Sequence, residues 1–138
     1  MEKYKKIYYE ANSFLQAANM LYSEENKACG WFNPVLYPTI VNISFACELF
    51  LKCLLVKNDI LIKKHNLKHL FDKLDDTQKE QIKRRTKATD FNAILEIHSE
   101  YFENFRYFYE KSKEVSMVNL SFMFSFANSL KRVIKEIL

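Results

Sequence analysis

One apolar stretch, residues 40–56 (IVNISFACELFLKCLLV), constrains the fold more than any other part of the chain. It is too apolar for a helix surface, yet it carries Ser44, Glu48 and Lys52, whose four-residue spacing places them in one row along a helix. A helix of about 17 residues spans roughly 25 Å, which suits the centre of a small bundle. The length is marginal for a membrane span, and two charges near the middle argue further against one. The stretch therefore predicts a central helix with a polar row in the core.

Composition favours a helical domain. The chain has 138 residues, 49% of them hydrophobic, and only 1 Gly and 2 Pro. This length suits a single domain, residues 1–138, and the scarcity of helix breakers favours long helices joined by short loops. We therefore expect an all-α, up-and-down antiparallel bundle of four long helices and two short ones, with no strand.

Apolar residues at three- and four-residue spacing set the expected helix boundaries. Asn66, Thr77 and Asp90 are the expected N-caps of the third, fourth and fifth helices, and Pro38 is expected to open the second. The predicted helices cover residues 2–25, 38–57, 67–74, 77–87, 91–111 and 117–138.

Cysteine usage and the N-terminus indicate a cytoplasmic location. Cys29, Cys47 and Cys53 form no CxxC pair, and the last two lie in the apolar stretch, where a thiol usually fills the core. This pattern fits a reducing compartment. The first residues, MEKYKKIYYEA, are basic but lack the apolar segment of a signal peptide.

The chain is mildly basic, with a formal net charge of +4. Its densest positive run comprises Lys79, Lys83, Arg84, Arg85 and Lys87, which Lys63, Lys64 and Lys68 extend in sequence. The run is either a solvated helix face or a surface that contacts phosphate groups. A single glycine excludes the Gly-rich phosphate loops, and no nucleophile motif of the GxSxG type occurs.

Two sets of charged residues are candidates for a site. Glu48 and Lys52 either pair within the core or place a carboxylate in a cleft. Arg106 lies within one helical turn of both Glu103 and Glu110, and aromatic residues flank it. It forms either ordinary surface ion pairs or a buried guanidinium that stacks on the rings and reaches Glu48.

The histidines do not indicate a metal site, and the sequence implies no cofactor. His65 and His69 lie four residues apart, but no third ligand with metal-binding spacing follows. Instead, we expect His65 to pack as the residue before a helix cap and His98 to be a core histidine.

Three segments in this order resemble the HEPN superfamily of small bacterial and archaeal proteins. They are SFACELFLKCLL (44–55), HNLKHLFDKL (65–74) and FENFRYFYE (102–110). The resemblance implies a helical bundle that forms a homodimer and associates with RNA or nucleotides, often in toxin–antitoxin, phage-defence or stress systems. It also implies a nucleotidyltransferase-type partner when such a gene is adjacent.

Many HEPN proteins are metal-independent ribonucleases whose motif is an Arg followed four to six residues later by a His. No His follows Arg106, Arg84 or Arg85 at that spacing, so the usual nuclease assignment is not carried over. The resemblance does extend to Glu48, Lys52, His65, Arg106, Tyr107 and Glu110.

Three functional hypotheses follow from the sequence. The first is a non-canonical HEPN-like homodimer, without the usual nuclease chemistry, that binds RNA or a nucleotide through Lys52, Lys83, Arg84, Arg85, Lys87, Arg106, Tyr107 and Glu110. The second is a divergent ribonuclease in which Arg106 stabilises the transition state and His65 or Tyr107 moves the proton, with Glu48 also in the site. The third is an interaction module, an antitoxin or adaptor, which the surplus of aromatic residues suggests.

Overall fold

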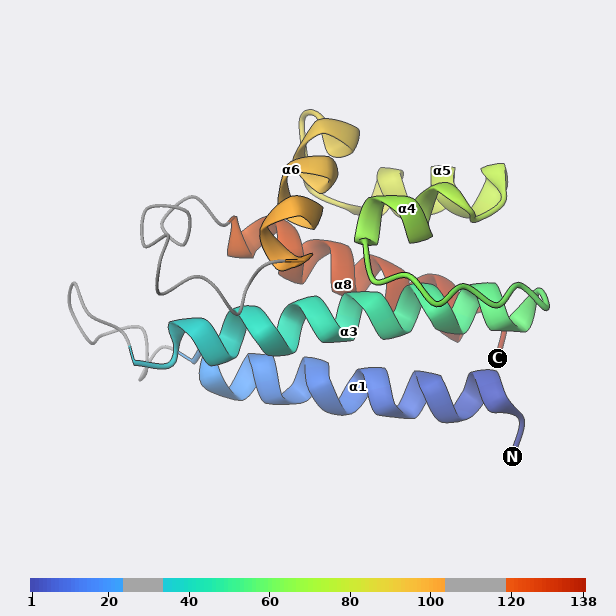
Figure 1. Ribbon diagram of the computed structural model, residues 1–138, viewed down its shortest axis with the longest axis horizontal. Helices are drawn as coiled ribbons and strands as arrows, with labels where there is room; N and C mark the ends of the chain where they lie inside the picture. The colour runs from blue at the N-terminus through green and yellow to red at the C-terminus, as the bar shows by residue number, and fades with distance from the viewer. Residues whose placement is uncertain (24–33, 104–118) are drawn as a thin grey trace.

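The computed structural model describes residues 1–23, 34–103 and 119–138, apart from the side chains of residues 101–103. Within these ranges the chain is all helical, and the expected all-α bundle is confirmed (Figure 1). The helices, labelled as in Figure 1, are α1 (Lys3–Leu21), α3 (Leu36–Lys57), α4 (Leu67–Asp72), α5 (Asp76–Arg85), α6 (Phe91–Glu103) and α8 (Leu120–Lys135).

Helix α3 is the centre of the bundle, as its sequence predicts. It packs against α1, α4 and α8. In Figure 1, α1 runs antiparallel to α3, whereas α8 follows the same direction as α3 and α6 is set across the other helices. Helix α5 packs on α8. Because α3 has neighbours on several sides, it can be apolar around most of its circumference.

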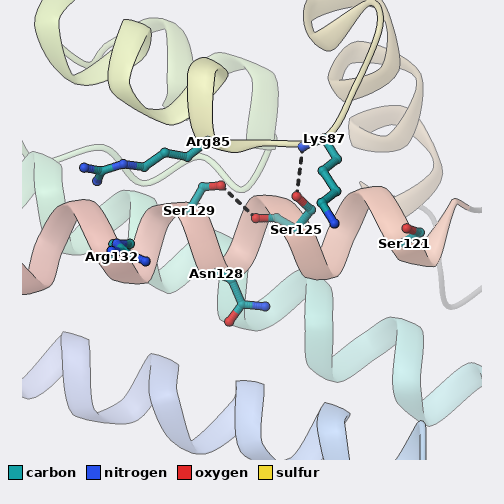
Figure 2. Close-up of a pocket in the computed structure, with 7 residues that line it drawn as sticks. All are labelled: Arg85, Lys87, Ser121, Ser125, Asn128, Ser129 and Arg132. Atoms are coloured by element: carbon teal, nitrogen blue, oxygen red, sulfur yellow. Dashed lines mark hydrogen bonds between the residues drawn. The ribbon is translucent and has the colours of Figure 1, made fainter.

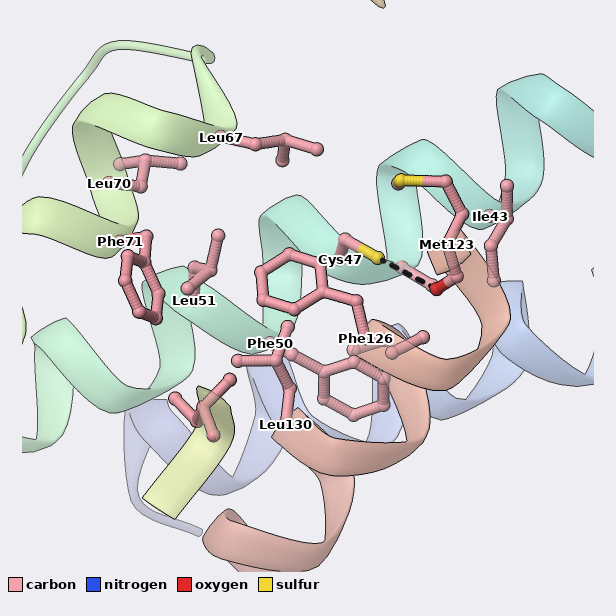
Figure 3. Close-up of a cluster of buried hydrophobic side chains, with 14 of the residues drawn as sticks. Ile43, Cys47, Phe50, Leu51, Leu67, Leu70, Phe71, Met123, Phe126 and Leu130 are labelled. Atoms are coloured by element: carbon pink, nitrogen blue, oxygen red, sulfur yellow. Dashed lines mark hydrogen bonds between the residues drawn. The ribbon is translucent and has the colours of Figure 1, made fainter. Parts of the chain in front are cut away.

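Aromatic and aliphatic side chains from α3, α4 and α8 fill the core (Figure 3). Phe126 lies 6.3 Å from Phe71 and 5.6 Å from Phe91, measured between ring centroids, in tilted arrangements that aromatic pairs prefer. Phe50 from α3 is also fully buried. This cluster joins α4 and the start of α6 to α8.

By length and composition alone, α3 could cross a membrane. However, 61% of its most apolar window is buried inside the molecule. The core helix of a soluble protein passes the same test, so the composition of α3 does not indicate a span.

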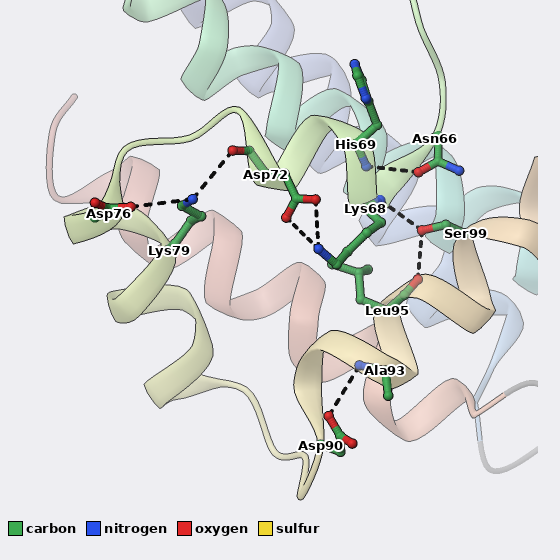
Figure 4. Close-up of polar contacts among 10 residues, drawn as sticks. All are labelled: Asn66, Lys68, His69, Asp72, Asp76, Lys79, Asp90, Ala93, Leu95 and Ser99. Carbon is green, nitrogen blue, oxygen red and sulfur yellow. Dashed lines mark hydrogen bonds and ion pairs between the residues drawn. The ribbon is translucent and has the colours of Figure 1, made fainter.

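The helix ends test the capping predictions. Asn66 accepts a hydrogen bond from the His69 N–H at 2.9 Å, and Asp90 accepts one from the Ala93 N–H at 3.3 Å, as expected (Figure 4). The prediction for Thr77 is wrong: Asp75 caps α5 by accepting from the Gln78 N–H at 2.7 Å. Asp75 is an equally good cap residue and has Gln78 at the matching third position, so the helix begins one residue earlier.

The ends of α3 and α8 also differ from the expected ones. Helix α3 begins at Leu36, so Pro38 lies within its first turn rather than opening it. At its other end, Asp59 adopts a left-handed φ of 61°, and the N–H of Ile60 reaches the carbonyl of Leu55 at 2.8 Å, which closes the helix with a Schellman turn. Helix α8 begins at Leu120, where Asn119 accepts from the Phe122 N–H at 2.9 Å.

Candidate nucleic-acid interface

The basic run of α5 divides between two sides of the helix. Lys79 and Lys83 face a hollow shared with α4 and α6, whereas Arg85 and Lys87 face α8. Arg84 is exposed and lines neither hollow. The run is therefore not one continuous patch, because residues four apart share a helix face and adjacent residues do not.

The end of α5 is fastened to α8 by two hydrogen bonds. The Thr86 hydroxyl lies 2.9 Å from the Ser129 hydroxyl, in the interior. The Lys87 N–H donates to the Ser125 hydroxyl at 2.9 Å (Figure 2). These contacts hold the backbone of residues 86 and 87 against α8, so the flanking Arg85 and Lys87 side chains lie over its surface.

A groove of about 500 Å³ lies between the end of α5 and α8 (Figure 2). The side of α8 contributes hydroxyl, amide and guanidinium groups to it. Its lining comprises Arg85, Lys87, Ser121, Ser125, Asn128, Ser129 and Arg132. Three of these side chains are cationic, and the hydroxyl of Ser121 and the amide of Asn128 are exposed, so the lining offers several groups that can donate to phosphate oxygens.

The groove carries excess positive charge. Among its cations, Arg85 alone has an ion-pair partner in the described part of the chain: its Nη2 lies 2.8 Å from Glu136 Oε1. The Nη1 of Arg85 is buried with no hydrogen-bond partner among the same residues. Arg85 is partly neutralised by Glu136, whereas Lys87 and Arg132 have no carboxylate partner within the described ranges.

A second hollow of about 700 Å³ continues from the groove toward the end of α8. Asn128 and Arg132 line both, and the second adds Lys131, Lys135 and Glu136. The two hollows therefore form one elongated surface. Its charges are Arg85, Lys87, Lys131, Arg132 and Lys135 against the single carboxylate of Glu136.

The other half of the basic run faces acidic residues. Lys79 lies 3.5 Å from Asp76, and Lys68 lies 2.6 Å from Asp72 (Figure 4). Lys83, with its Nζ 6.0 Å from the centre of the Phe71 ring, lines the same hollow of about 240 Å³. Because Glu80 also lines it, positive and negative groups balance there, and this side of α5 has little net attraction for phosphate.

Glu48 and Lys52 form a pair at the rim of the core. Lys52 Nζ lies 3.0 Å from Glu48 Oε2, and the two side chains are 20% and 13% exposed. Pairing was one of the two interpretations of the polar row, and the two side chains do pair; both keep a small exposed fraction, whereas Ser44 is buried. Desolvation explains the difference, because a rim position keeps both charged ends partly hydrated.

His65 joins this pair. Its Nδ1 lies 2.9 Å from Glu48 Oε2 and 3.5 Å from Lys52 Nζ. The carboxylate accepts, so Nδ1 carries the hydrogen, and in the neutral ring the lone pair is on the other nitrogen, Nε2. The His65 side chain is 71% exposed, so it does not pack beneath the helix cap as expected.

The remaining candidates fall into two groups. Arg106, Tyr107 and Glu110 lie outside the described residues, so the predicted contact between Arg106 and Glu48 stays a prediction.

His98 is a core histidine, as expected: Nδ1 donates to the Ile94 carbonyl at 2.9 Å, and Nε2 accepts from the Asn119 N–H at 2.8 Å. Burial lowers the pKa of His98, and the bond to Ile94 offsets part of that change.

Metal and thiol chemistry find no support in the described part of the chain. No cluster of three potential metal ligands occurs within it. Burial raises the pKa of both core thiols, that of Cys53 to about 11, with nearby Lys57 lowering it slightly. Cys47 and Cys53 are therefore inert core fillers, as their positions predict.

No known protein-family model matches this chain, and neither the curated proteins nor the solved structures include a match.

Sequence reasoning missed the contribution of α8 to the groove. Ser121, Ser125, Asn128 and Arg132 follow helical spacing and form a polar row opposite the apolar face of the helix. The row was readable from the sequence, but its juxtaposition with Arg85 and Lys87 depends on how α5 packs.

Proposed function

We propose that this chain is an RNA-associated, HEPN-like homodimeric domain of the cytoplasm, which contacts the RNA backbone through the groove between α5 and α8. The observation that supports the proposal most strongly is the convergence of Arg85, Lys87 and Arg132 on a hydroxyl-lined groove that has excess positive charge. The resemblance to HEPN proteins supplies the link to RNA and to toxin–antitoxin, phage-defence or stress systems.

The shape of the surface favours a polymer over a single nucleotide. The groove and its continuation extend along α8 from Ser121 to Lys135, and both are open to solvent. A helix rises 1.5 Å per residue, so this path is roughly 20 Å long, which corresponds to several nucleotides. Cations and hydroxyls distributed along such a path hold phosphates without reading base sequence.

The test is fluorescence anisotropy with a labelled RNA oligonucleotide at low salt. We expect binding, and we expect the triple substitution Arg85→Gln, Lys87→Gln and Arg132→Gln to weaken it at least tenfold. The matched control replaces three exposed cations elsewhere, Lys3→Gln, Lys6→Gln and Lys73→Gln, and should retain most of the affinity.

Three results would contradict the proposal. They are no binding at low salt, equal losses in the two triple variants, and a preference for a free mononucleotide over the oligonucleotide. The last result would assign the groove to a nucleotide ligand.

The homodimer part of the proposal rests on the resemblance and on the outer surface of the α1–α3 pair. There Phe45, 38% exposed, stacks on Phe14 with 5.4 Å between ring centroids. Exposed aromatic side chains are enriched at protein interfaces. Sedimentation equilibrium should show a dimer that Phe45→Lys dissociates and that Tyr9→Lys, at a more exposed aromatic, does not. A monomeric wild-type protein would contradict the dimer.

A divergent ribonuclease is a second candidate, and the Glu48–His65 contact favours it. A carboxylate that holds Nδ1–H leaves Nε2 free to remove a proton, which is the arrangement of a general base. On RNA, Nε2 would take the 2′-hydroxyl proton, and the 2′-oxygen would attack phosphorus. The bond from phosphorus to the 5′-oxygen would break, and water would protonate the departing 5′-oxygen. Lys63 and Lys64, exposed beside His65, would attract the phosphate backbone.

This candidate is tested with purified protein, RNA and EDTA. The candidate predicts products with 2′,3′-cyclic phosphate ends, lost in His65→Gln and kept in His69→Gln. Cleavage that is unchanged in His65→Gln, or no cleavage of RNA that binds, would exclude it.

A further inference from the structure

An aromatic pair lies beside the basic groove, at the other side of α8. Tyr22, which directly follows α1, and Phe124 of α8 have nearly parallel rings, 14° apart, with 5.4 Å between centroids. At that separation parallel rings are offset, so neither ring covers the whole face of the other. Both side chains are only partly buried.

The pair lines a hollow of about 440 Å³ between α1 and α8. Its other lining residues are Asn19, Ser121 and Asn128, and the last two also line the basic groove. Ser121 and Asn128 are exposed and form the ridge of α8 between the two hollows. In Figure 2 the Asn128 side chain points from α8 toward α1, away from Arg85.

We propose that this surface recognises single-stranded RNA, with phosphates in the groove between α5 and α8 and a base stacked against Tyr22 and Phe124. The inference rests on the proposed function and specifies the form of RNA. A strand that crosses the α8 ridge meets cations on one side and aromatic rings on the other.

The chemistry excludes a duplex from this arrangement. Base faces in a duplex are covered by their neighbours, so only an unpaired base can stack on a side chain. Stacking tolerates every base because each has a π face, whereas the groove attracts the backbone electrostatically. Asn128, whose Nδ2 donates to the Phe124 carbonyl at 2.8 Å, keeps its side-chain oxygen at the ridge as an acceptor for a base amino group.

The experiment compares three ligands by anisotropy competition at equal phosphate concentration: a single-stranded 12-mer RNA, the corresponding duplex, and inorganic polyphosphate, which has no bases. We expect the single strand to bind most tightly. Phe124→Leu, which keeps the apolar volume but removes the ring, should weaken the single strand about 5- to 100-fold and leave polyphosphate unchanged. Tyr22→Phe is the matched control, because it keeps the ring, and should bind like wild type.

A second readout reports stacking directly. A 2-aminopurine base in the single strand should lose fluorescence on binding to wild type and to Tyr22→Phe, but not on binding to Phe124→Leu. Circular dichroism confirms that each variant is folded.

The outcomes separate the two proposals. Equal binding of all three ligands, or a Phe124→Leu variant that weakens polyphosphate as much as RNA, would overturn the stacking inference and leave the anion groove standing. If no ligand binds at low salt, both proposals fail.

Discussion

The hydroxyl groups of Thr86 and Ser129 lie 2.9 Å apart in the interior and connect the end of α5 to the middle of α8. Ser129 also donates to the Ser125 carbonyl at 2.8 Å, and the Thr86 hydroxyl lies 2.7 Å from the Ile82 carbonyl. Each hydroxyl group has only one hydrogen to donate. The Thr86 and Ser129 hydroxyls therefore form one connected chain of hydrogen bonds, in which neither can donate to two acceptors at once. These linked hydrogen bonds set the position of Arg85 and Lys87 over α8.

Thr86→Val tests that connection. Valine has the shape of threonine, but it removes the hydroxyl and leaves the facing Ser129 oxygen short of a partner. We expect a loss of about 1–2 kcal/mol in unfolding free energy, measured by urea denaturation, and weaker RNA binding. Thr77→Val, at an exposed position on the same helix, should change neither quantity. Equal effects at both positions would show that the connection is unimportant.

Phe126→Leu and Phe126→Ala test the core. Phe126 is fully buried among Phe71, Phe91 and Phe122. Truncation to alanine should cost about 3–5 kcal/mol of unfolding free energy, because transfer and cavity terms add, and leucine should cost less. Tyr9→Ala, at a ring that is 58% exposed, is the control and should cost under about 1 kcal/mol. Comparable losses at the two positions would contradict the assigned core.

The N-terminus of α5 gives a prediction with two opposed outcomes. Asp75→Ala removes the bond to the Gln78 N–H and should destabilise the protein by about 1 kcal/mol in thermal or urea unfolding. Thr77→Ala, at the position that the capping-box pattern favoured, should have almost no effect. The reverse order would restore Thr77 as the cap.

His98 predicts a dependence of stability on pH. Burial lowers the folded-state pKa of His98 below the usual histidine value of about 6.5, so the unfolded chain binds a proton more readily as the pH falls. The contribution of His98 to the unfolding free energy is therefore fully present above about pH 6.5. It decreases below that pH, by at most about 1.4 kcal/mol per pH unit. His98→Gln should show a shallower loss of unfolding free energy between pH 7 and pH 5. Identical slopes would contradict the assignment.

The sequence predicted most of the fold because its signals were local. The apolar run of α3 identified the central helix, and Asn66 and Asp90 identified two helix starts. Asp75 and Thr77 are both good N-cap residues and lie two positions apart, so the local sequence does not determine which of them caps α5. The sequence placed Glu48 and Lys52 in the core, but the apolar run does not reveal that this side of α3 reaches the rim of the core.

The candidate site was less predictable because it depends on tertiary contacts. The run from Lys79 to Lys87 looked like one patch, but packing placed Lys83 beside acidic residues and Arg85 beside Arg132. Likewise, Glu48 and His65 were separate candidates in the sequence, and only the fold brings them within hydrogen-bonding distance, at 2.9 Å. Contacts between residues far apart in the chain leave no spacing pattern to read.

The salt dependence of RNA binding tests the central claim most directly. Each phosphate that a cation neutralises on a single strand contributes about 0.7 to the slope of log affinity against log salt concentration. If Arg85, Lys87 and Arg132 each contact a phosphate, their triple replacement by glutamine should reduce the slope by about 2, while the control variant of Lys3, Lys6 and Lys73 keeps the wild-type slope. An unchanged slope in the groove variant, or binding of the wild type that does not depend on salt, would contradict the claim that this groove holds the RNA backbone.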